Sequence, residues 1–182
     1  PFLVFDDADI DSAIEGAIIS KFRNCGQTCV CTNRFYVQDA VYDEFVQKLA
    51  KRAAAMKIGY GMDEGVVVGP LIDEAAVEKV EEHLEDALAG GATVLAGGKR
   101  LHGTFFEPTV VANVKADMKL AREETFGPLA GVIRFSDEAE AIRLANDSEF
   151  GLSGALWTRN KDLARQLARR MDTGGVFVNG FS

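Results

Sequence analysis

The sequence predicts an α/β domain, a mostly parallel sheet with helices on both faces, because short strand-like segments alternate with amphipathic helical ones. The strand-like segments are rich in Val, Ile, Phe and Thr, and helical segments of roughly ten to fifteen residues follow most of them. Strands joined through helices pair in parallel, and such a sheet is covered on both faces. No segment repeats, and 182 residues suffice for one compact domain with a real core.

The first elements can be placed from individual residues. Residues 2–5 are apolar and predict a short buried strand. Asp9 suits an N-cap, because its side chain can accept a hydrogen bond from a free backbone N–H and apolar residues follow it at helical spacing. We expect this helix to end near Phe22. Residues 23–28 include Gly26 and therefore predict a turn.

The later elements continue the alternation. Runs of β-branched and aromatic residues predict strands at residues 34–38, 93–95, 109–111, 129–135, 154–158 and 176–178. Apolar residues at helical spacing predict helices at residues 41–56, 74–88, 137–146 and 161–171. Gly90 and Gly91 are a usual stop for the helix before them. Residues 59–65 are rich in glycine, but their spacing does not fit a dinucleotide-binding motif, and we expect a loop there.

Composition and charge exclude several classes of partner. Hydrophobic residues make up 47% of the chain and charged residues 26%, the balance of a folded domain. The net charge of −8 disfavours nucleic acid and anionic membrane surfaces, which bind clusters of Lys and Arg. No apolar run approaches the roughly 20 residues of a membrane-spanning helix, and the first residues lack the features of a signal peptide. We expect neither nucleic acid nor membrane as a partner. Because the chain lacks an initiator Met, we expect it to be a piece of a longer protein.

Three cysteines, Cys25, Cys29 and Cys31, lie close together in the sequence. Disulfide frameworks of secreted domains spread their cysteines along the chain, so this clustering indicates a reducing, cytoplasmic compartment and a local chemical role. We expect no metal, because no second pair of ligands follows at zinc-binding spacing. His83 and His102 lie in polar segments and are expected at the surface, so neither is an obvious base for a cysteine.

The segment that ends at Cys31 concentrates the chemistry of the chain. A thiol is a good nucleophile when it is partly exposed in an electropositive turn. Cys29 follows the turn at Gly26, Arg23 supplies positive charge, and backbone N–H groups beside Cys29 can stabilise an oxyanion. A structural role for Cys29 stays open, because free cysteines are usually buried.

The motif Gly-Gln-Thr-Cys at residues 26–29 resembles the active-site cysteine motif of the NAD(P)-dependent aldehyde dehydrogenase superfamily. The Glu-Glu-Thr-Phe-Gly-Pro stretch at residues 123–128 and the stretch at 174–179 resemble later motifs of the same family, in the same order. The resemblance covers essentially the whole chain. Within the superfamily, residues 21–31 and 67–74 are most similar to the succinate-semialdehyde dehydrogenases.

This resemblance implies the fold of the aldehyde dehydrogenase catalytic domain and oxidation of succinate semialdehyde to succinate with NAD or NADP. Cys29 would add to the aldehyde to give a thiohemiacetal, hydride would pass to the nicotinamide, and water would hydrolyse the resulting thioester. Glu124 would accept hydrogen bonds from the nicotinamide ribose, and Phe126 would pack near the nicotinamide. The alternatives are a solvated acidic turn for Glu124 and a core position for Phe126.

The resemblance also suggests roles for Arg23 and Cys31. The guanidinium of Arg23 would bind the far carboxylate of a semialdehyde in a bidentate pair. The alternative is an arginine that tunes the thiol or pairs with a surface acid. Cys31 is two residues from Cys29, and a reversible disulfide between them would block the nucleophile under oxidation. Cys25 is expected to pack in the interior.

The same resemblance assigns residues 1–182 to a single catalytic domain, with the cofactor-binding domain, the general-base Glu and a C-terminal segment outside this chain. We expect the fragment to fold but to be inactive alone, and the full-length protein to be a homo-oligomer that acts on a small, carboxylated aldehyde. One alternative is a dehydrogenase for another semialdehyde or a neutral aldehyde. Another is a non-catalytic structural descendant. A thiol redox protein built on Cys29 and Cys31 conflicts with the match over the rest of the chain.

Overall fold

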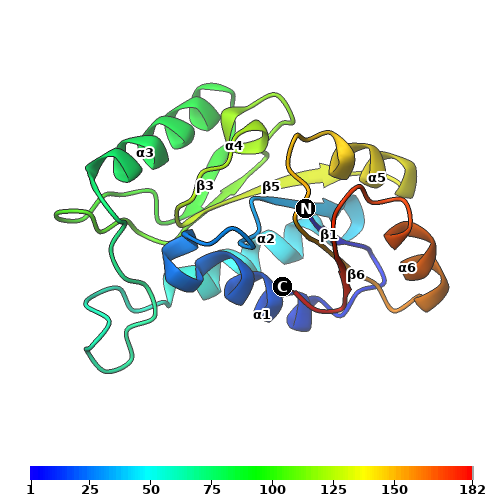
Figure 1. The fold of residues 1–182 in the computed structure, drawn as a ribbon, viewed down its shortest axis with the longest axis horizontal. Helices are drawn as coiled ribbons and strands as arrows, with labels where there is room; N and C mark the ends of the chain where they lie inside the picture. Colours follow the sequence, from blue (N-terminus) through cyan, green and yellow to red (C-terminus); the bar gives the residue numbers. More distant parts are fainter. Residues whose placement is uncertain (182) are drawn as a thin grey trace.

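The computed structural model describes residues 1–181, and a seven-stranded sheet runs through their centre (Figure 1). The strands are β1 (Phe2–Val4), β2 (Arg34–Gln38), β3 (Thr93–Ala96), β4 (Thr109–Ala112), β5 (Leu129–Phe135), β6 (Gly154–Trp157) and β7 (Val176–Val178). They lie in the order β3-β4-β5-β2-β1-β6-β7. All neighbours pair in parallel except β3 and β4, which are antiparallel at one edge. The predicted mostly parallel α/β fold is confirmed.

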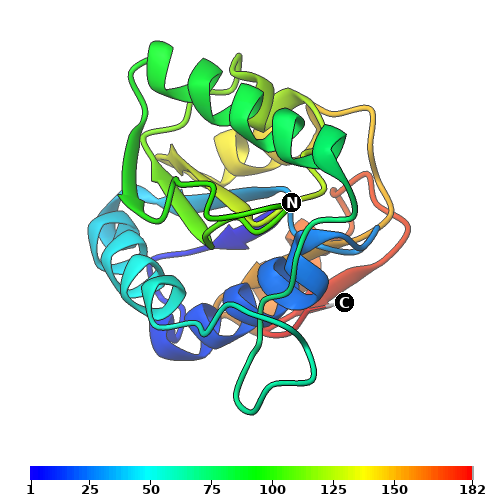
Figure 2. The same ribbon diagram turned by 90° about the vertical axis from the view of Figure 1, so that its left-hand side faces the viewer.

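Helices cover both faces of this sheet (Figures 1 and 2). They are α1 (Ile10–Phe22), α2 (Asp39–Ala54), α3 (Glu74–Ala89), α4 (Lys119–Arg122), α5 (Glu138–Asn146) and α6 (Lys161–Ala168), and a short 3-10 turn, η1 (Arg23–Gly26), follows α1. The buried residues of α1 and α2 form one core with the sheet. Those of α3 to α6 form a second core on the opposite face.

Successive strand residues alternate between these two cores. In β1, Leu3 belongs to the core under α3 to α6, whereas Phe2 and Val4 belong to the core under α1 and α2. In β2, Tyr36 belongs to the core under α3 to α6, and Phe35 belongs to the core under α1 and α2. Both sides of the central strands are therefore buried, which is why these strands are continuous apolar runs in the sequence rather than alternating ones.

Side-chain caps fix where the helices begin. Asp9 accepts a hydrogen bond from the backbone of α1, as predicted, and Asp73, Asp137 and Asn160 do the same for α3, α5 and α6. Helix α6 is shorter than expected and ends at Ala168, because the chain then tightens into a turn. The short helix α4 was not predicted, since four residues are too few to show a helical period.

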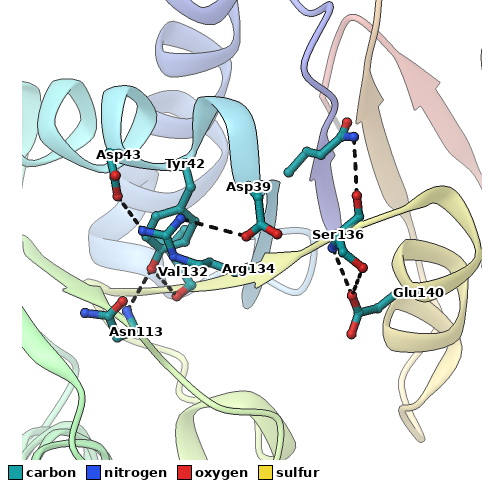
Figure 3. Close-up of polar contacts among 9 residues, drawn as sticks. Asp39, Tyr42, Asp43, Asn113, Val132, Arg134, Ser136 and Glu140 are labelled. Carbon is teal, nitrogen blue, oxygen red and sulfur yellow. Dashed lines mark hydrogen bonds and ion pairs between the residues drawn. The ribbon is translucent and has the colours of Figure 1, made fainter.

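Tyr42 joins α2 to the sheet (Figure 3). Its hydroxyl donates to the backbone oxygen of Val132 at 3.0 Å and accepts from the backbone N–H of Asn113 at 2.7 Å. The guanidinium of Arg134 lies 3.8 Å from the centre of the Tyr42 ring and pairs with Asp43 on α2. These contacts hold α2 against β5 and satisfy polar groups that the packing buries.

Candidate active site

Three consecutive residues in the left-handed region turn the chain where α1 ends. Their φ values are 49° at Asn24, 57° at Cys25 and 77° at Gly26. Asn and Gly adopt this conformation readily, whereas Cys rarely does. Hydrogen bonds between Asn24 and Gln27 close the turn in both directions, each at 3.0 Å. The turn predicted at this place is therefore present, and it leads directly into the loop that carries Cys29.

Gln27 ties this turn to a distant loop. Its side-chain oxygen accepts the backbone N–H of Ile72 at 2.8 Å, and its side-chain nitrogen donates to the backbone oxygen of Pro70 at 3.3 Å. One amide thus satisfies both a donor and an acceptor of a loop 43 to 45 positions further along the chain. The Gln of the Gly-Gln-Thr-Cys motif has a structural role here, fixing the cysteine loop to the start of α3.

Cys29 is exposed and lies in a tight turn. The backbone N–H of Cys31 donates to the carbonyl of Thr28 at 3.0 Å and closes this turn around Cys29. Within residues 1–181 no acceptor takes the backbone N–H of Cys29 itself. The residue lines a cavity of about 80 Å³. An exposed thiol beside a free N–H at a cavity is the arrangement that a cysteine nucleophile requires.

Glu124 lines the same cavity as Cys29, although 95 positions separate them in the sequence. The backbone on either side of it is held by Asn33, whose side chain donates to the carbonyl of Glu123 at 2.8 Å and accepts the N–H of Thr125 at 3.2 Å. Asn33 also lines the cavity. A single amide from the cysteine loop therefore positions the segment that presents Glu124. Sequence reasoning did not single out Asn33, because nothing local to it indicates a partner 90 positions away.

Phe126 is partly exposed, at 38%, and has a φ of 54°. A core position for this aromatic is therefore wrong. Phe126 does not line the cavity with Cys29 and Glu124. Its left-handed backbone, rare for a bulky residue, directs the chain into Gly127 and Pro128, which precede β5. Its role beside a nicotinamide stays a prediction.

The other two cysteines differ in their environments, and all three thiols are free. Cys25 is buried, as expected, and burial raises the pKa of its thiol to about 12. Cys31 is half-buried, with its sulfur 2.8 Å from the hydroxyl of Thr28 and 3.8 Å from the carbonyl of Arg23. It lines the cavity with Cys29. The proposed disulfide between Cys29 and Cys31 stays a prediction.

Arg23 lines a different groove from Cys29. This groove, of about 440 Å³, lies between α1 and the end of α2, and Arg52 and Lys57 also line it. Arg52 is paired with Glu15 through two hydrogen bonds, at 2.7 and 2.8 Å. The structure therefore separates Arg23 from the cavity of the nucleophile, and its role toward a substrate carboxylate stays a prediction.

Lys21 is buried in the last turn of α1, 1% exposed. Burial lowers the pKa of its ammonium to about 8, although Cys31, Cys25 and Glu124 act in the opposite direction. A cationic residue thus lies among the cysteines and the cavity carboxylate. Nothing in the sequence indicates this burial, because a lysine near a helix C-terminus is usually solvated.

His83 is buried, and its expected place at the surface is wrong. It lies on the inner face of α3, where its Nδ1 is 3.0 Å from the hydroxyl of Thr125. Charged neighbours surround His83 in the sequence, and such a pattern favours the surface. His102 is exposed, as predicted.

In residues 1–181 no group of three or more His, Cys, Asp or Glu side chains is arranged to hold a metal ion. Over the same residues, none of the helices combines the length and apolarity needed to cross a bilayer. The glycine-rich residues 59–65 form a loop, as expected.

Comparisons with known proteins agree with this geometry. A model of the "Aldehyde dehydrogenase family" matches residues 1–182. The chain is 56% identical over 179 residues to a glutarate-semialdehyde dehydrogenase of Pseudomonas putida, covering 98% of this chain and 37% of the relative. It is 55% identical over 181 residues to a 3-sulfolactaldehyde dehydrogenase of Pseudomonas putida, with coverages of 98% and 37%. The crystal structure of a succinate-semialdehyde dehydrogenase from Burkholderia pseudomallei superposes with a TM-score of 0.97 at 55% identity, covering 99% of this chain and 38% of that one. The chain thus spans a little over a third of the length of these relatives.

Proposed function

The chain belongs to the aldehyde dehydrogenase family, and we propose that it is the cysteine-bearing catalytic domain of an NAD(P)-dependent dehydrogenase that oxidises succinate semialdehyde to succinate. This proposal rests on the observation that Cys29 and Glu124 line the same cavity. The first is an exposed thiol and the second an exposed carboxylate. Covalent chemistry on an aldehyde and binding of a hydroxylated cofactor need these two groups side by side.

The thiol of Cys29 carries the covalent chemistry. As a thiolate it adds to the aldehyde carbon, forming a C–S bond and a tetrahedral alkoxide. The backbone N–H of Cys29, free of acceptors within residues 1–181, can donate to that alkoxide. A donor of this kind contributes about 2.7–4 kcal/mol to catalysis. Oxidation of the carbon leaves a thioester on Cys29, and water cleaves it to the carboxylic acid and the free thiol.

The residues at the cavity fit a nicotinamide cofactor. An ionised carboxylate accepts hydrogen bonds and cannot donate them, so Glu124 suits paired ribose hydroxyls. Phe126 does not line this cavity, but it offers a partly exposed aromatic ring two residues from Glu124. NAD or NADP, when bound, supplies the acceptor for the hydride that the carbon loses. The side chain of Asn33 holds the backbone on both sides of Glu124 and so positions its carboxylate.

An anionic substrate is supported by the names of the relatives. Glutarate semialdehyde, succinate semialdehyde and 3-sulfolactaldehyde each carry an acidic group apart from the aldehyde. Arg23 is six residues before Cys29 and is the cation that the family resemblance assigns to that group, although it lines a different groove from Cys29. The second candidate substrate is glutarate semialdehyde, because the relative named for it is 56% identical to this chain. We also propose that the complete protein is a cytoplasmic homo-oligomer, as expected from the sequence.

The test uses the complete enzyme that carries this chain. We expect NAD(P)H to form with succinate semialdehyde at a higher kcat/KM than with glutarate semialdehyde or butanal, and Cys29→Ala to abolish the reaction. The matched control is Cys25→Ala, which changes a buried thiol. A preference for glutarate semialdehyde would select the second candidate. Full activity of Cys29→Ala would overturn the mechanism.

The predicted inhibition of Cys29 by a reversible disulfide to Cys31 is tested separately. If a disulfide to Cys29 forms under oxidation, peroxide will inactivate the wild type reversibly, with recovery on adding dithiothreitol. Cys31→Ala will recover less, because its Cys29 has no partner for a disulfide at that position and peroxide carries it on to the sulfinic acid, which dithiothreitol does not reduce. Equal recovery in both proteins would sink this idea.

A further inference from the structure

The segment that presents Glu124 has no regular secondary structure of its own. It runs from the end of α4 at Arg122 to the start of β5 at Leu129. Its backbone at Glu123 is extended, with φ −106° and ψ 155°. Extended residues direct successive side chains to opposite sides, so Glu123 and Thr125 face one way and Glu124 the other. What holds Glu123 and Thr125 therefore determines where Glu124 points.

Both of those side chains meet one buried residue, His83 on α3. Its Nδ1 lies 3.0 Å from the hydroxyl of Thr125, which is itself 1% exposed. Its Nε2 lies 3.3 Å from Oε2 of Glu123, at an ion-pair distance but without the alignment of a hydrogen bond. His83 is 1% exposed, so its contact with Thr125 is made away from water, whereas the side chain of Glu123 is 54% exposed. The two residues that flank Glu124 thus share one imidazole.

From this arrangement we infer that His83 is a positioning residue, which anchors Glu123 and Thr125 to α3 and so directs Glu124 into the Cys29 cavity. The inference rests on the proposed function, because it gives Glu124 the cofactor. It adds a second anchor to the one that Asn33 provides from the cysteine loop. With Asn33 holding the backbone and His83 the side chains, the segment is fixed from two sides.

The chemistry of the ring suits this task. Burial lowers the pKa of His83, more than nearby Glu123 raises it, so the ring is neutral at pH 7. A neutral imidazole has one acceptor and one donor nitrogen. The Thr125 hydroxyl can then donate to Nδ1, while the hydrogen on Nε2 is on the side of the Glu123 carboxylate. Leucine offers neither nitrogen, whereas glutamine retains one donor and one acceptor.

The experiment measures cofactor affinity directly, in the complete enzyme. NADH and NADPH are titrated against wild type, His83→Leu, His83→Gln and His102→Leu, and Kd is read from the fluorescence of the reduced nicotinamide. We expect His83→Leu to weaken binding about tenfold and to raise KM for the cofactor more than KM for the aldehyde. His83→Gln is expected to restore most of the affinity. His102→Leu, at an exposed histidine, is the matched control and should equal wild type.

A second variant keeps the inference testable if His83→Leu does not fold. Thr125→Val removes only the hydroxyl that His83 contacts and keeps the volume, and we expect it to weaken cofactor binding in the same direction. Wild-type Kd in both folded His83→Leu and Thr125→Val would overturn the inference. Failure of the proposed function is a separate result, in which the wild type binds no reduced cofactor or oxidises no aldehyde.

Discussion

Gly26 and Gly127 touch through their backbones, so that a Cβ on Gly26 would lie 2.6 Å from the carbonyl carbon of Gly127. One glycine precedes Cys29 and the other follows Phe126. The two motifs that sequence similarity places in one family are thus packed directly against each other. The contact needs both the absence of a side chain and a φ of 77°, conditions that glycine meets without strain.

Gly26→Ala is expected to destabilise the protein by about 1–3 kcal/mol, because alanine is strained at this φ and its methyl group collides with backbone that cannot rotate away. Urea unfolding measures the change. Gly61→Ala is the control, since nothing lies within 4 Å of a Cβ at that position. Equal stability of the two variants would show that the contact is not as tight as described.

Alkylation should distinguish the cysteines. At pH 8 we expect iodoacetamide to modify Cys29 well before Cys25, because Cys29 is exposed whereas burial raises the pKa of Cys25 to about 12 and removes its thiolate. Mass spectrometry of peptides from a time course measures both rates in one sample. Urea-unfolded protein is the control, in which the two rates should converge. Comparable rates in the folded protein would contradict the burial of Cys25.

Lys21 should make stability depend on pH in a predictable direction. Its pKa is about 8 in the folded protein, below the 10.5 of an unperturbed lysine, so between these values the unfolded chain binds more protons and stability rises with pH. Below pH 8 the buried charge costs on the order of 3 kcal/mol. Lys21→Met should therefore stabilise the protein at pH 7, and this gain should shrink as the pH rises from 8 to 10.5. Urea unfolding across this range, with Lys161→Met as an exposed control, measures the difference. A gain that does not change with pH would refute the buried charge.

Tyr42→Phe is expected to cost about 1–3 kcal/mol, because it leaves the N–H of Asn113 without its partner and removes one of the two hydrogen bonds that the carbonyl of Val132 accepts (Figure 3). The ring and its stacking with Arg134 remain, so the loss reports the hydroxyl alone. Thermal unfolding measures it. Tyr60→Phe, at a tyrosine that is 65% exposed, is the control and should have little effect. No loss in Tyr42→Phe would mean that water replaces the hydroxyl.

Local patterns were sufficient to predict most of the fold. The bounds of β5 and β7 agree with the structure, because β-branched runs flanked by glycine or proline are read within a few residues. Asp9 was identified as a cap because capping depends on residues three positions apart. Cys29 and Glu124 were singled out through family motifs. Their shared cavity could not have been derived from either motif alone, since it depends on strand order.

What the sequence did not reveal depends on distant partners. His83 has charged neighbours in α3, and only its contact with Thr125, 42 positions away, explains its burial. The sequence around Asn33 does not indicate its partner, because only the pairing of β2 with β5 brings Glu123 beside it. Lys21 lies in the last turn of α1, and its burial near Cys25 and Cys31 depends on how that turn packs. In each case tertiary packing places a polar residue beside partners that are distant in the sequence, and helical or strand periodicity carries no information about that.

Arg23 offers the sharpest test of substrate choice. If its guanidinium binds the far carboxylate, Arg23→Leu should raise KM for succinate semialdehyde by roughly 10- to 100-fold, the cost of losing a charge-assisted hydrogen bond, and should leave KM for butanal nearly unchanged. Arg52→Leu is the matched control, because Arg52 lines the same groove but is already paired with Glu15. Steady-state kinetics of the complete enzyme with both aldehydes measures the two ratios. An equal effect on both aldehydes would assign Arg23 to the fold of the cysteine loop, whose Cys31 sulfur already contacts the Arg23 carbonyl.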